Sequence, residues 1–400
     1  MTERHCPVCG NPSKQLIYHQ SFSQISEGSL FNGYDVVVCG HCGFVFADNI
    51  PSQEEFDRYY KQMSKYENEH QGGQISICTQ ETYDSIVQQV KPFLANEDSY
   101  ILDVGCATGG LLATFQKNGY KNVLGFDPSP SCSRTAQRLY GIQVENRPVS
   151  EISDFEAKFD LVIFNSVLEH IRDISESLKT MRNLLKPGGL IWIEVPDITR
   201  FAEYTSVAFQ QFSMEHINFF SSVSLTNLMQ RNGFEVEAIW HNVRQLEEIQ
   251  DPALSTLYRR VEQVSTSGVF KADLVSKSAL LEYLDYSYQA DTNVLEIIDE
   301  IVSSGRAIVV WGVGTHTQRL LATSRLKNAN IKAFIDSNPN YHGKKLIEVP
   351  IYSPEILAGM TEPILVSSRL YQDEIATAIR LTLKLSNDII LLYKRGRNQI

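Results

Sequence analysis

No apolar run in this sequence approaches the roughly 18 residues of a membrane-spanning helix. The first residues, Met1 to His5, lack the charged and apolar regions of a secretory signal peptide. Positive charge is scarce, because 36 Lys and Arg residues stand against 47 Asp and Glu residues, for a net charge of −11. These absences argue against a membrane protein, a secreted protein and a large nucleic-acid-binding surface. We therefore expect a cytoplasmic, acidic globular protein with reduced thiols.

A chain of 400 residues exceeds one ordinary hydrophobic core and indicates two or three domains. Between about residues 100 and 240, strand-like and helical stretches alternate, which predicts a parallel sheet covered by helices on both faces. The expected strands are Tyr100–Val104, Val123–Phe126, Leu161–Phe164 and Leu190–Val195, and the expected helices include Leu111–Asn118 and Ser129–Tyr140. After a connector at about 250–304 that we expect to be helical, the alternation returns with Ala307–Trp311 and Ile331–Asp336.

Four of the seven cysteines form two CxxC pairs near the N-terminus, Cys6 with Cys9 and Cys39 with Cys42. A glycine follows each pair directly and can turn the chain beneath a metal ion. Four thiolates in this arrangement are typical of a structural zinc site with no open coordination position. The intervening segment reads as a short hairpin that is too small to be stable by core burial alone, so bound metal would contribute folding energy. Redox-active or disulfide-bonded thiol pairs are the alternative.

Two glycine-rich loops follow strands in the two halves of the chain. The first begins at Gly105 and the next strand closes at Asp127, whereas the second begins at Gly312 and the next strand closes at Asp336. Both spacings fit a βαβ unit whose acidic residue meets a ribose diol. The sequence therefore predicts two Rossmann-type domains in tandem behind the cysteine module.

The first loop fits a dinucleotide fingerprint only with Ala107 in the place of the second glycine, which is a weak signal. Asp103 favours a different ligand, because a carboxylate two residues before Gly105 can reach a cationic amino group and would repel a pyrophosphate. Two further segments accompany the loop: Asn165–Ile171 follows a buried strand, and Asn183–Gly189 precedes another. These details indicate S-adenosylmethionine as the ligand.

With these motifs in order, residues 80 to 240 resemble the class I S-adenosylmethionine-dependent methyltransferases, whose Asp-x-Gly-x-Gly-x-Gly loop corresponds to Asp103–Gly109 with Ala107 as the one departure. By this resemblance Asp103 would hold the methionine ammonium group, Asp127 the ribose hydroxyls, and Asn165 would lie near the methionine part. The implied cofactor-binding set is Asp103, Gly105, Ala107, Gly109, Asp127 and Asn165.

The order of parts over essentially the whole chain resembles the zinc-containing C-methyltransferases that act on nucleotide-linked keto-deoxysugars. Met214–Ser221 matches their Glu-His followed by an aromatic and a serine, and Trp311–Thr315 with Ile335–Lys344 matches their second glycine loop. The resemblance implies a small-molecule substrate, a nucleotide-linked sugar. Carbon methylation beside a ketone requires a base for the α-proton, and His216 suits that role, with Glu215 either orienting it or holding a substrate hydroxyl. A loop-anchoring role for Glu215 and His216 is the alternative.

One departure weakens carbon methylation in particular. The C-methyltransferases resembled here carry a tyrosine and a histidine before the Glu-His pair, whereas this chain has Ser213 and Met214. O- or N-methylation of a sugar or another small metabolite, and a non-catalytic cofactor-binding scaffold, therefore stay open. An RNA methyltransferase would explain zinc with S-adenosylmethionine, but the negative charge argues against it.

The predicted fold class is α/β in three parts: a zinc-binding module at 1–60, a class I methyltransferase domain at 61–245, and a C-terminal Rossmann-like domain at 246–400. By resemblance the last part would help to hold the substrate's nucleotide diphosphate, although a purely structural role is open too. The sequence leaves open the sugar, the nucleotide, the oligomeric state and the role of Tyr59, Tyr60 and Tyr66.

Overall fold

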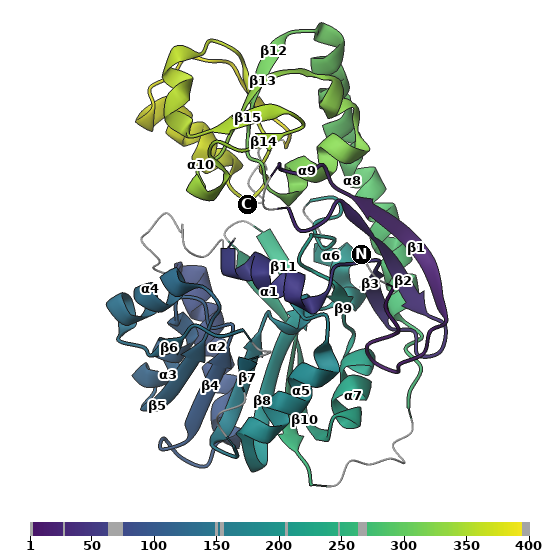
Figure 1. Cartoon of the computed structure of the whole chain (residues 1–400), viewed down its shortest axis with the longest axis vertical. Coiled ribbons are helices and arrows are strands. Elements are labelled where there is room, and N and C mark those ends of the chain that lie inside the picture. The colour runs from purple at the N-terminus through teal and green to yellow at the C-terminus, as the bar shows by residue number, and fades with distance from the viewer. Residues whose placement is uncertain are drawn as a thin grey trace, which may run out of the picture. The chain divides into compact units, whose positions relative to one another are not determined.

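The computed structural model describes residues 3–26, 29–62, 75–148, 151–152, 156–204, 207–246, 249–262 and 270–393. They belong to two compact units (Figure 1), and the predicted division at 60 and 245 stays a prediction. The first unit comprises 1–18, 35–204 and 215–282, and the second comprises 19–34, 205–214 and 283–400. Within the described ranges, no helix has the length and apolar character needed to cross a membrane.

A seven-stranded sheet forms the centre of the first unit, in the order β10-β11-β8-β7-β4-β5-β6. Its strands are β4 (Tyr100–Val104), β5 (Asn122–Phe126), β6 (Val144–Glu145), β7 (Phe159–Asn165), β8 (Leu185–Pro196), β10 (Phe234–Leu246) and β11 (Ile249–Arg260). The pairs along β8-β7-β4-β5-β6 are parallel, whereas β11 runs antiparallel to both β8 and β10. The four predicted strands are confirmed. Strand order reverses beside β4, so the carboxyl ends of β4 and β7 mark the expected ligand edge.

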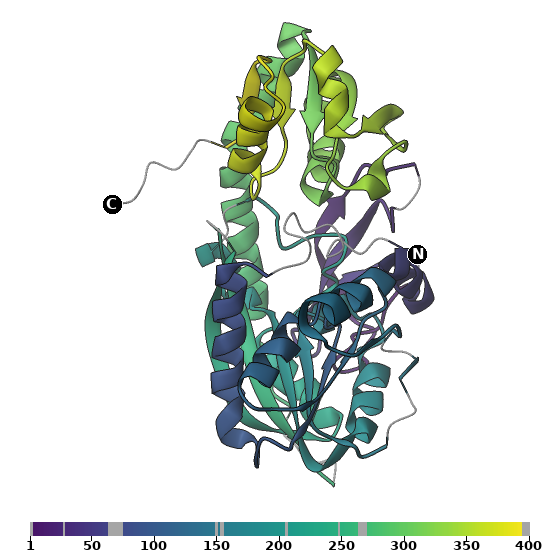
Figure 2. The same ribbon diagram turned by 90° about the vertical axis from the view of Figure 1, so that its left-hand side faces the viewer.

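Helices cover both faces of this sheet, as predicted. Helices α2 (Ile77–Val90), α3 (Gly110–Lys117) and α4 (Pro130–Tyr140) cover one face and are drawn in blue in Figure 2, and α5 (Ile174–Leu184) and α7 (Ser222–Arg231) cover the other. Successive strand residues point to opposite faces, so Ile101 packs with the first group and Leu102 with the second. Both residues are fully buried, which explains why the strands read as continuous apolar runs.

The expected helical connector from about residue 250 is wrong over its first part. Residues 249–260 form β11, which is hydrogen-bonded between β8 and β10, and the helix of this region, α8, spans Ser276–Ser304. Leu254, Leu257 and Tyr258 are fully buried in the strand. A strand covered on both faces has no alternation of polar and apolar residues, so its sequence resembles a buried helix.

The N-terminal module contributes to a four-stranded sheet in the order β1-β2-β3-β9. These strands are β1 (Lys14–Ser21), β2 (Gly33–Cys39), β3 (Val45–Asp48) and β9 (Asn218–Phe219). Strands β2 and β3 form the predicted hairpin. Strand β3 also pairs with β9, far along the chain, through Val45 opposite Phe219 and Phe46 opposite Asn218. Helix α1 (Gln53–Gln62) follows the module.

The second unit is built on a six-stranded sheet in the order β14-β15-β13-β12-β16-β17, which confirms a second C-terminal sheet domain. All its pairs are parallel except β14 with β15. The strands are β12 (Ala307–Trp311), β13 (Asn330–Ile335), β14 (Lys345–Leu346), β15 (Val349–Tyr352), β16 (Ile364–Val366) and β17 (Ile389–Leu391), with helices α9 (Thr315–Thr323) and α10 (Gln372–Thr377). A short helix of the first unit, α6, spans Phe201–Tyr204.

Candidate active site and metal centre

The loop after β4 turns tightly at the carboxyl end of the sheet. The backbone amide of Gly105 donates to Phe126 O at 2.7 Å, and the amide of Ala107 donates to a carboxylate oxygen of Asp127 at 3.0 Å. The other carboxylate oxygen of Asp127 accepts from Ser129 N at 2.9 Å, at the start of α4. The structure therefore brings the predicted loop and Asp127 together, and Asp127 fixes the loop's shape.

Two positions show how closely the chain is packed around this loop. Gly105 has a φ of 76°, and a β-carbon there would lie 2.6 Å from Cγ2 of Val167, so a side chain does not fit. Ala107 has a φ of 47°, in the left-handed region that costs an alanine about 1 kcal/mol or more. Ala107 adopts this conformation although it is not a glycine, which indicates that the surrounding contacts impose the shape of the loop.

Asp103, in β4 just before the loop, is a buried carboxylate in an unfavourable environment. Its side chain is 3% exposed, and its Oδ1 atom has no hydrogen-bond partner among the described residues. Burial, together with the nearby charge of Asp127, raises the pKa of Asp103 well above its usual value. A ligand ammonium group would supply both the missing donor and the missing positive charge, so this residue fits the S-adenosylmethionine cofactor.

The end of β7 supplies a second unpartnered acceptor and a short turn. The Oδ1 atom of Asn165 is buried and has no hydrogen-bond partner in the part of the chain that the structure describes. Val167, which packs on Gly105, precedes a single 3-10 turn, Leu168–His170. This turn connects the cofactor loop to a second group of polar residues.

Two histidines from distant segments face one another in that second group. The ring centroids of His170 and His216 are 5.1 Å apart. Nδ1 of His170 lies 2.8 Å from the carbonyl oxygen of Glu215. A carbonyl only accepts, so Nδ1 carries the proton and Nε2 is the basic nitrogen of His170. The predicted pair Glu215 and His216 is thus joined by an imidazole from the turn after β7.

Glu169 is a further member of this group. It is 1% exposed, its Oε1 lies 3.9 Å from Nε2 of His170, and its Oε2 has no hydrogen-bond partner within the described ranges. Burial raises the pKa of Glu169, while the charges of His170 and Arg244 oppose this rise. Ligand atoms of Glu169, His170 and His216 all lie within 4.8 Å of one another, so the three side chains form one compact polar group.

Two tyrosines of helix α1 lie beside Glu215 and His170. The hydroxyl of Tyr59 donates to a carboxylate oxygen of Glu215 at 3.2 Å, and the ring of Tyr60 lies 6.0 Å from that of His170. The third tyrosine of the cluster, Tyr66, lies outside the described residues.

Sequence reasoning did not select Glu169, His170 or Tyr59 as site residues. One signal was available, because the dipeptide Glu-His occurs three times, as Glu69-His70, Glu169-His170 and Glu215-His216. The copy at Glu169-His170 comes shortly after a strand that ends at the ligand edge of the sheet. The role of Tyr59 had no comparable signal, because it depends on where α1 lies in the fold.

The four predicted metal ligands also come together. Their Sγ atoms lie within 4.8 Å of one another, and Cys6 with Cys42 and Cys9 with Cys39 are each separated by 3.5 Å. A tetrahedral zinc site with bonds of about 2.3 Å has sulfur–sulfur edges of about 3.8 Å, so the arrangement can hold a metal ion. Sγ of Cys39 accepts from the amides of His41 and Cys42 at 3.4 and 3.5 Å, as is usual around a bound thiolate.

In the C-terminal glycine loop, as in the loop of the first unit, an aspartate accepts hydrogen bonds from backbone amides. Carboxylate oxygens of Asp336 accept from Val313 N at 2.9 Å and from Asn338 N at 2.8 Å. Beyond the loop, His316 is hydrogen-bonded to the hydroxyl of Tyr393 at 3.1 Å. Burial, with a contribution from Arg319, lowers the pKa of His316 to about 3. This imidazole is neutral at physiological pH, so any anion here would be held by backbone amides of the loop and α9.

Residues 79–239 match a family model described as a methyltransferase domain, and residues 304–391 match one described as C2185-like, N-terminal. A C-methyltransferase of Streptomyces niveus, NovU, is 24% identical over 81% of this chain and 77% of its own length. A ubiquinone biosynthesis O-methyltransferase of Rhizobium leguminosarum bv. trifolii is 27% identical over 47% of this chain and 69% of its own.

Among solved structures, a Burkholderia thailandensis 1,6-didemethyltoxoflavin-N1-methyltransferase with bound S-adenosylhomocysteine aligns with a TM-score of 0.42 and 18% identity. The alignment covers 56% of this chain and 97% of that one.

The strand order with antiparallel β11, the loop at Asp103 and the matched domain together define an S-adenosylmethionine-dependent enzyme. Residues 79–239 form a class I methyltransferase domain. Its cofactor is S-adenosylmethionine, which supplies a methyl group activated by a sulfonium.

The electrostatics of Asp103 lead to a prediction about pH. A bound cation lowers the pKa of a carboxylate, so Asp103 is protonated at higher pH in the free protein than in the complex. Affinity for S-adenosylhomocysteine, which keeps the methionine ammonium, should therefore fall as the pH is lowered through the pKa of Asp103 in the free protein. Binding should release a proton, measurable by calorimetry in buffers of different ionisation enthalpy.

Asp103→Asn should bind more weakly and lose this pH dependence. Asp160→Asn is the matched control, because Asp160 lies at the other end of the sheet and pairs with Lys186 at 2.7 Å. If Asp103→Asn retained the proton release of the wild type, another group would be the ammonium ligand.

Proposed function

We propose that this enzyme transfers a methyl group from S-adenosylmethionine to a nucleotide-linked sugar, at the carbon beside a keto group, with His216 as the base. The observation that carries the proposal is the pairing of His216 with His170, 5.1 Å apart by ring centroids. Their group includes two glutamates and follows directly from the strand that ends at Asn165. The match to a C-methyltransferase over 81% of the chain supports it.

The reaction removes the α-proton of the substrate and then transfers the methyl group to the α-carbon. An unprotonated imidazole of His216 takes the α-proton, and the electrons of the broken C–H bond delocalise onto the keto oxygen. The enolate carbon then forms the new C–C bond as the S–CH3 bond breaks, leaving S-adenosylhomocysteine. The His170 imidazole beside it can hold or relay the proton, because Nδ1 is anchored on Glu215 and Nε2 faces Glu169.

The missing phenol before the Glu-His pair has a candidate replacement. Tyr59 donates to Glu215 at 3.2 Å, so a phenol reaches the same carboxylate from α1. We assign to Glu215 the orientation of substrate hydroxyls, with Tyr59 fixing its rotamer.

The nucleotide part of the substrate is assigned to the second unit. The loop after β12 presents backbone amides at the start of α9, a helix of nine residues, and such amides bind phosphate oxygens. We assign the cysteine cluster to a structural Zn2+ ion, which closes the N-terminal module and takes no part in the reaction.

The direct test is incubation with S-adenosylmethionine and a panel of nucleotide-linked keto- and aminosugars, followed by mass spectrometry. The expected result is one added methyl group on a ketosugar nucleotide. Products methylated on oxygen or nitrogen alone, or acceptance only of sugars without a nucleotide, would contradict the proposal.

Heavy water separates the mechanisms in the same assay. With S-adenosylhomocysteine bound in place of the methyl donor, the α-carbon of a true substrate should exchange its hydrogen for deuterium. Methylation of a hydroxyl or amine requires no such exchange.

A second prediction concerns the base. His216→Ala should lower kcat by about 10²–10⁴-fold, because a positioned base contributes a factor of this size, and should leave S-adenosylhomocysteine binding unchanged by calorimetry. His19→Ala, an exposed histidine of the second unit, is the control and should behave as wild type. An active His216→Ala variant would place the base elsewhere.

A third prediction concerns the metal. Purified protein should contain close to one zinc per chain by elemental analysis, and Cys42→Ser should lower the unfolding midpoint by about 10 °C or more. Cys78→Ser is the control, because Cys78 lies on α2 outside the cluster. Metal-free protein of unchanged stability would contradict a structural zinc.

A further inference from the structure

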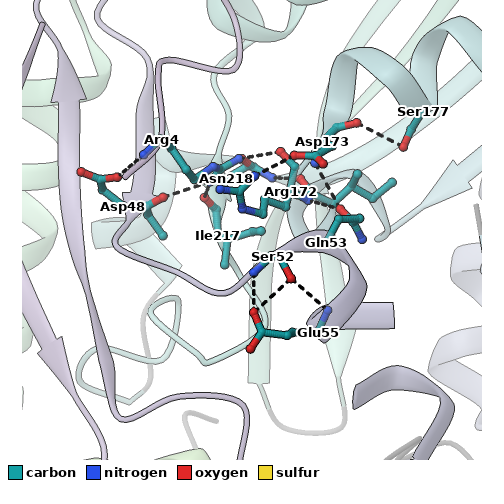
Figure 3. A network of polar contacts seen from close by, with 12 residues as sticks. Arg4, Asp48, Ser52, Gln53, Glu55, Arg172, Asp173, Ser177, Ile217 and Asn218 are labelled. Atoms are coloured by element: carbon teal, nitrogen blue, oxygen red, sulfur yellow. Dashed lines mark hydrogen bonds and ion pairs between the residues drawn. The ribbon is translucent and has the colours of Figure 1, made fainter. Parts of the chain in front are cut away.

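Arg4, two residues before the first metal-ligand candidate, is almost completely buried, with 4% of its surface exposed. Figure 3 shows its guanidinium group pointing toward Asn218 and Ile217. One guanidinium nitrogen donates to Ala47 O at 3.0 Å and to Ile217 O at 3.3 Å. The other donates to Arg172 O at 2.8 Å and to Oδ1 of Asn218 at 3.2 Å. One side chain thus joins three separate segments.

Two of those segments carry the facing histidines. Ile217 directly follows His216, and Arg172 lies two residues after His170. Every acceptor that receives the Arg4 guanidinium is an uncharged oxygen, and burial lowers the pKa of Arg4. A guanidinium held in this way is costly to desolvate, whereas its planar donors fix several acceptors at once. The buried guanidinium of Arg4 is therefore best explained as a group that holds these segments in a fixed arrangement.

Asn218 extends the connection to the turn after β7. Its Nδ2 donates to Ile171 O at 2.7 Å and to Leu168 O at 3.2 Å. The amide of Ile217 donates to Glu169 O at 2.9 Å. Arg4 and Asn218 together therefore bridge the chain on both sides of Glu169 and His170 to the residues that follow His216.

The N-terminal module holds Arg4 in turn. The backbone amide of Arg4 donates to Oδ1 of Asp48 at 2.6 Å, and Lys14 pairs with the other oxygen of Asp48 at 2.6 Å. Asp48 ends β3, whose pairing with β9 runs beside these contacts. A second link comes from α1, where Oε1 of Gln53 accepts from Arg172 N at 2.9 Å and from Asp173 N at 3.1 Å (Figure 3).

We infer that Arg4 is a positioning residue, through which the cysteine module sets the relative orientation of His170 and His216. The inference rests on the proposed function, because it assumes that this histidine pair acts on the substrate. It gives the N-terminal module a role in turnover that goes beyond the stability of the fold. The Arg4 side-chain hydrogen bonds described above do not involve the cofactor loop after Asp103, so cofactor binding should be insensitive to Arg4.

The test compares Arg4→Met with Arg306→Met. Arg306 is an exposed arginine of the second unit that pairs with Asp388 at 3.4 Å, so the same substitution there removes an arginine that takes no part in the Arg4 contacts. Arg4→Met should bind S-adenosylhomocysteine within about twofold of wild type, while the NMR titration midpoints of His170 and His216 shift. With an accepted substrate, kcat should fall by about 10- to 100-fold with a smaller change in KM, and added guanidinium ion should restore part of it. Arg306→Met should match wild type in each readout.

Wild-type histidine titrations and kcat in an Arg4→Met protein that binds S-adenosylhomocysteine would overturn the inference. If Arg4→Met does not bind the ligand, Asn218→Asp decides instead, since it keeps the acceptor for Arg4 and removes the donors to Leu168 and Ile171. Unshifted histidines and unchanged kcat in that variant would equally overturn it. The titrations need no methyl acceptor, so a failure of the proposed substrate class leaves this test intact.

Discussion

Val167 packs closely on Gly105, and this contact joins the glycine loop after β4 to the turn after β7. Because a β-carbon at position 105 would lie only 2.6 Å from Cγ2 of Val167, the glycine loop and the turn after β7 approach to direct contact. Asp103 lies in β4 just before the loop, Asp127 accepts from the loop amide of Ala107, and the turn carries Glu169 and His170. Any displacement of β4 against β7 would separate them, so the parallel pairing of these strands also fixes the spacing between the loop and the turn.

The charge of this edge explains the kind of ligand it takes. Asp103 and Glu169 are buried carboxylates, each with one oxygen that lacks a hydrogen-bond partner among the described residues. The pKa of each is raised mainly by burial. Such an edge disfavours a pyrophosphate and favours a ligand with an ammonium and a sulfonium group. The choice between a dinucleotide and S-adenosylmethionine therefore has an electrostatic basis.

Local patterns predicted local features well. The strand at Tyr100–Val104, the loop after it and Asp127 are contiguous motifs, and the structure places them as expected. Strand β11 was mistaken for helix, because burial on both faces removes the alternation that identifies a strand. Glu169, Tyr59 and Arg4 were missed for another reason: their partners lie far along the chain.

The N-terminal module depends on residues that are synthesised much later. Arg4 and its acceptor Asn218 are separated by 214 positions, and β3 pairs with β9 through Val45 opposite Phe219 and Phe46 opposite Asn218, which are also far apart in the chain. During synthesis the four cysteines therefore precede the strand that completes their sheet by well over a hundred residues. Loop closure over such a length is slow compared with local folding. The local hairpin of β2 and β3 can thus form before β9 is available, and the contacts that tie the module to the histidine-bearing segments are added later.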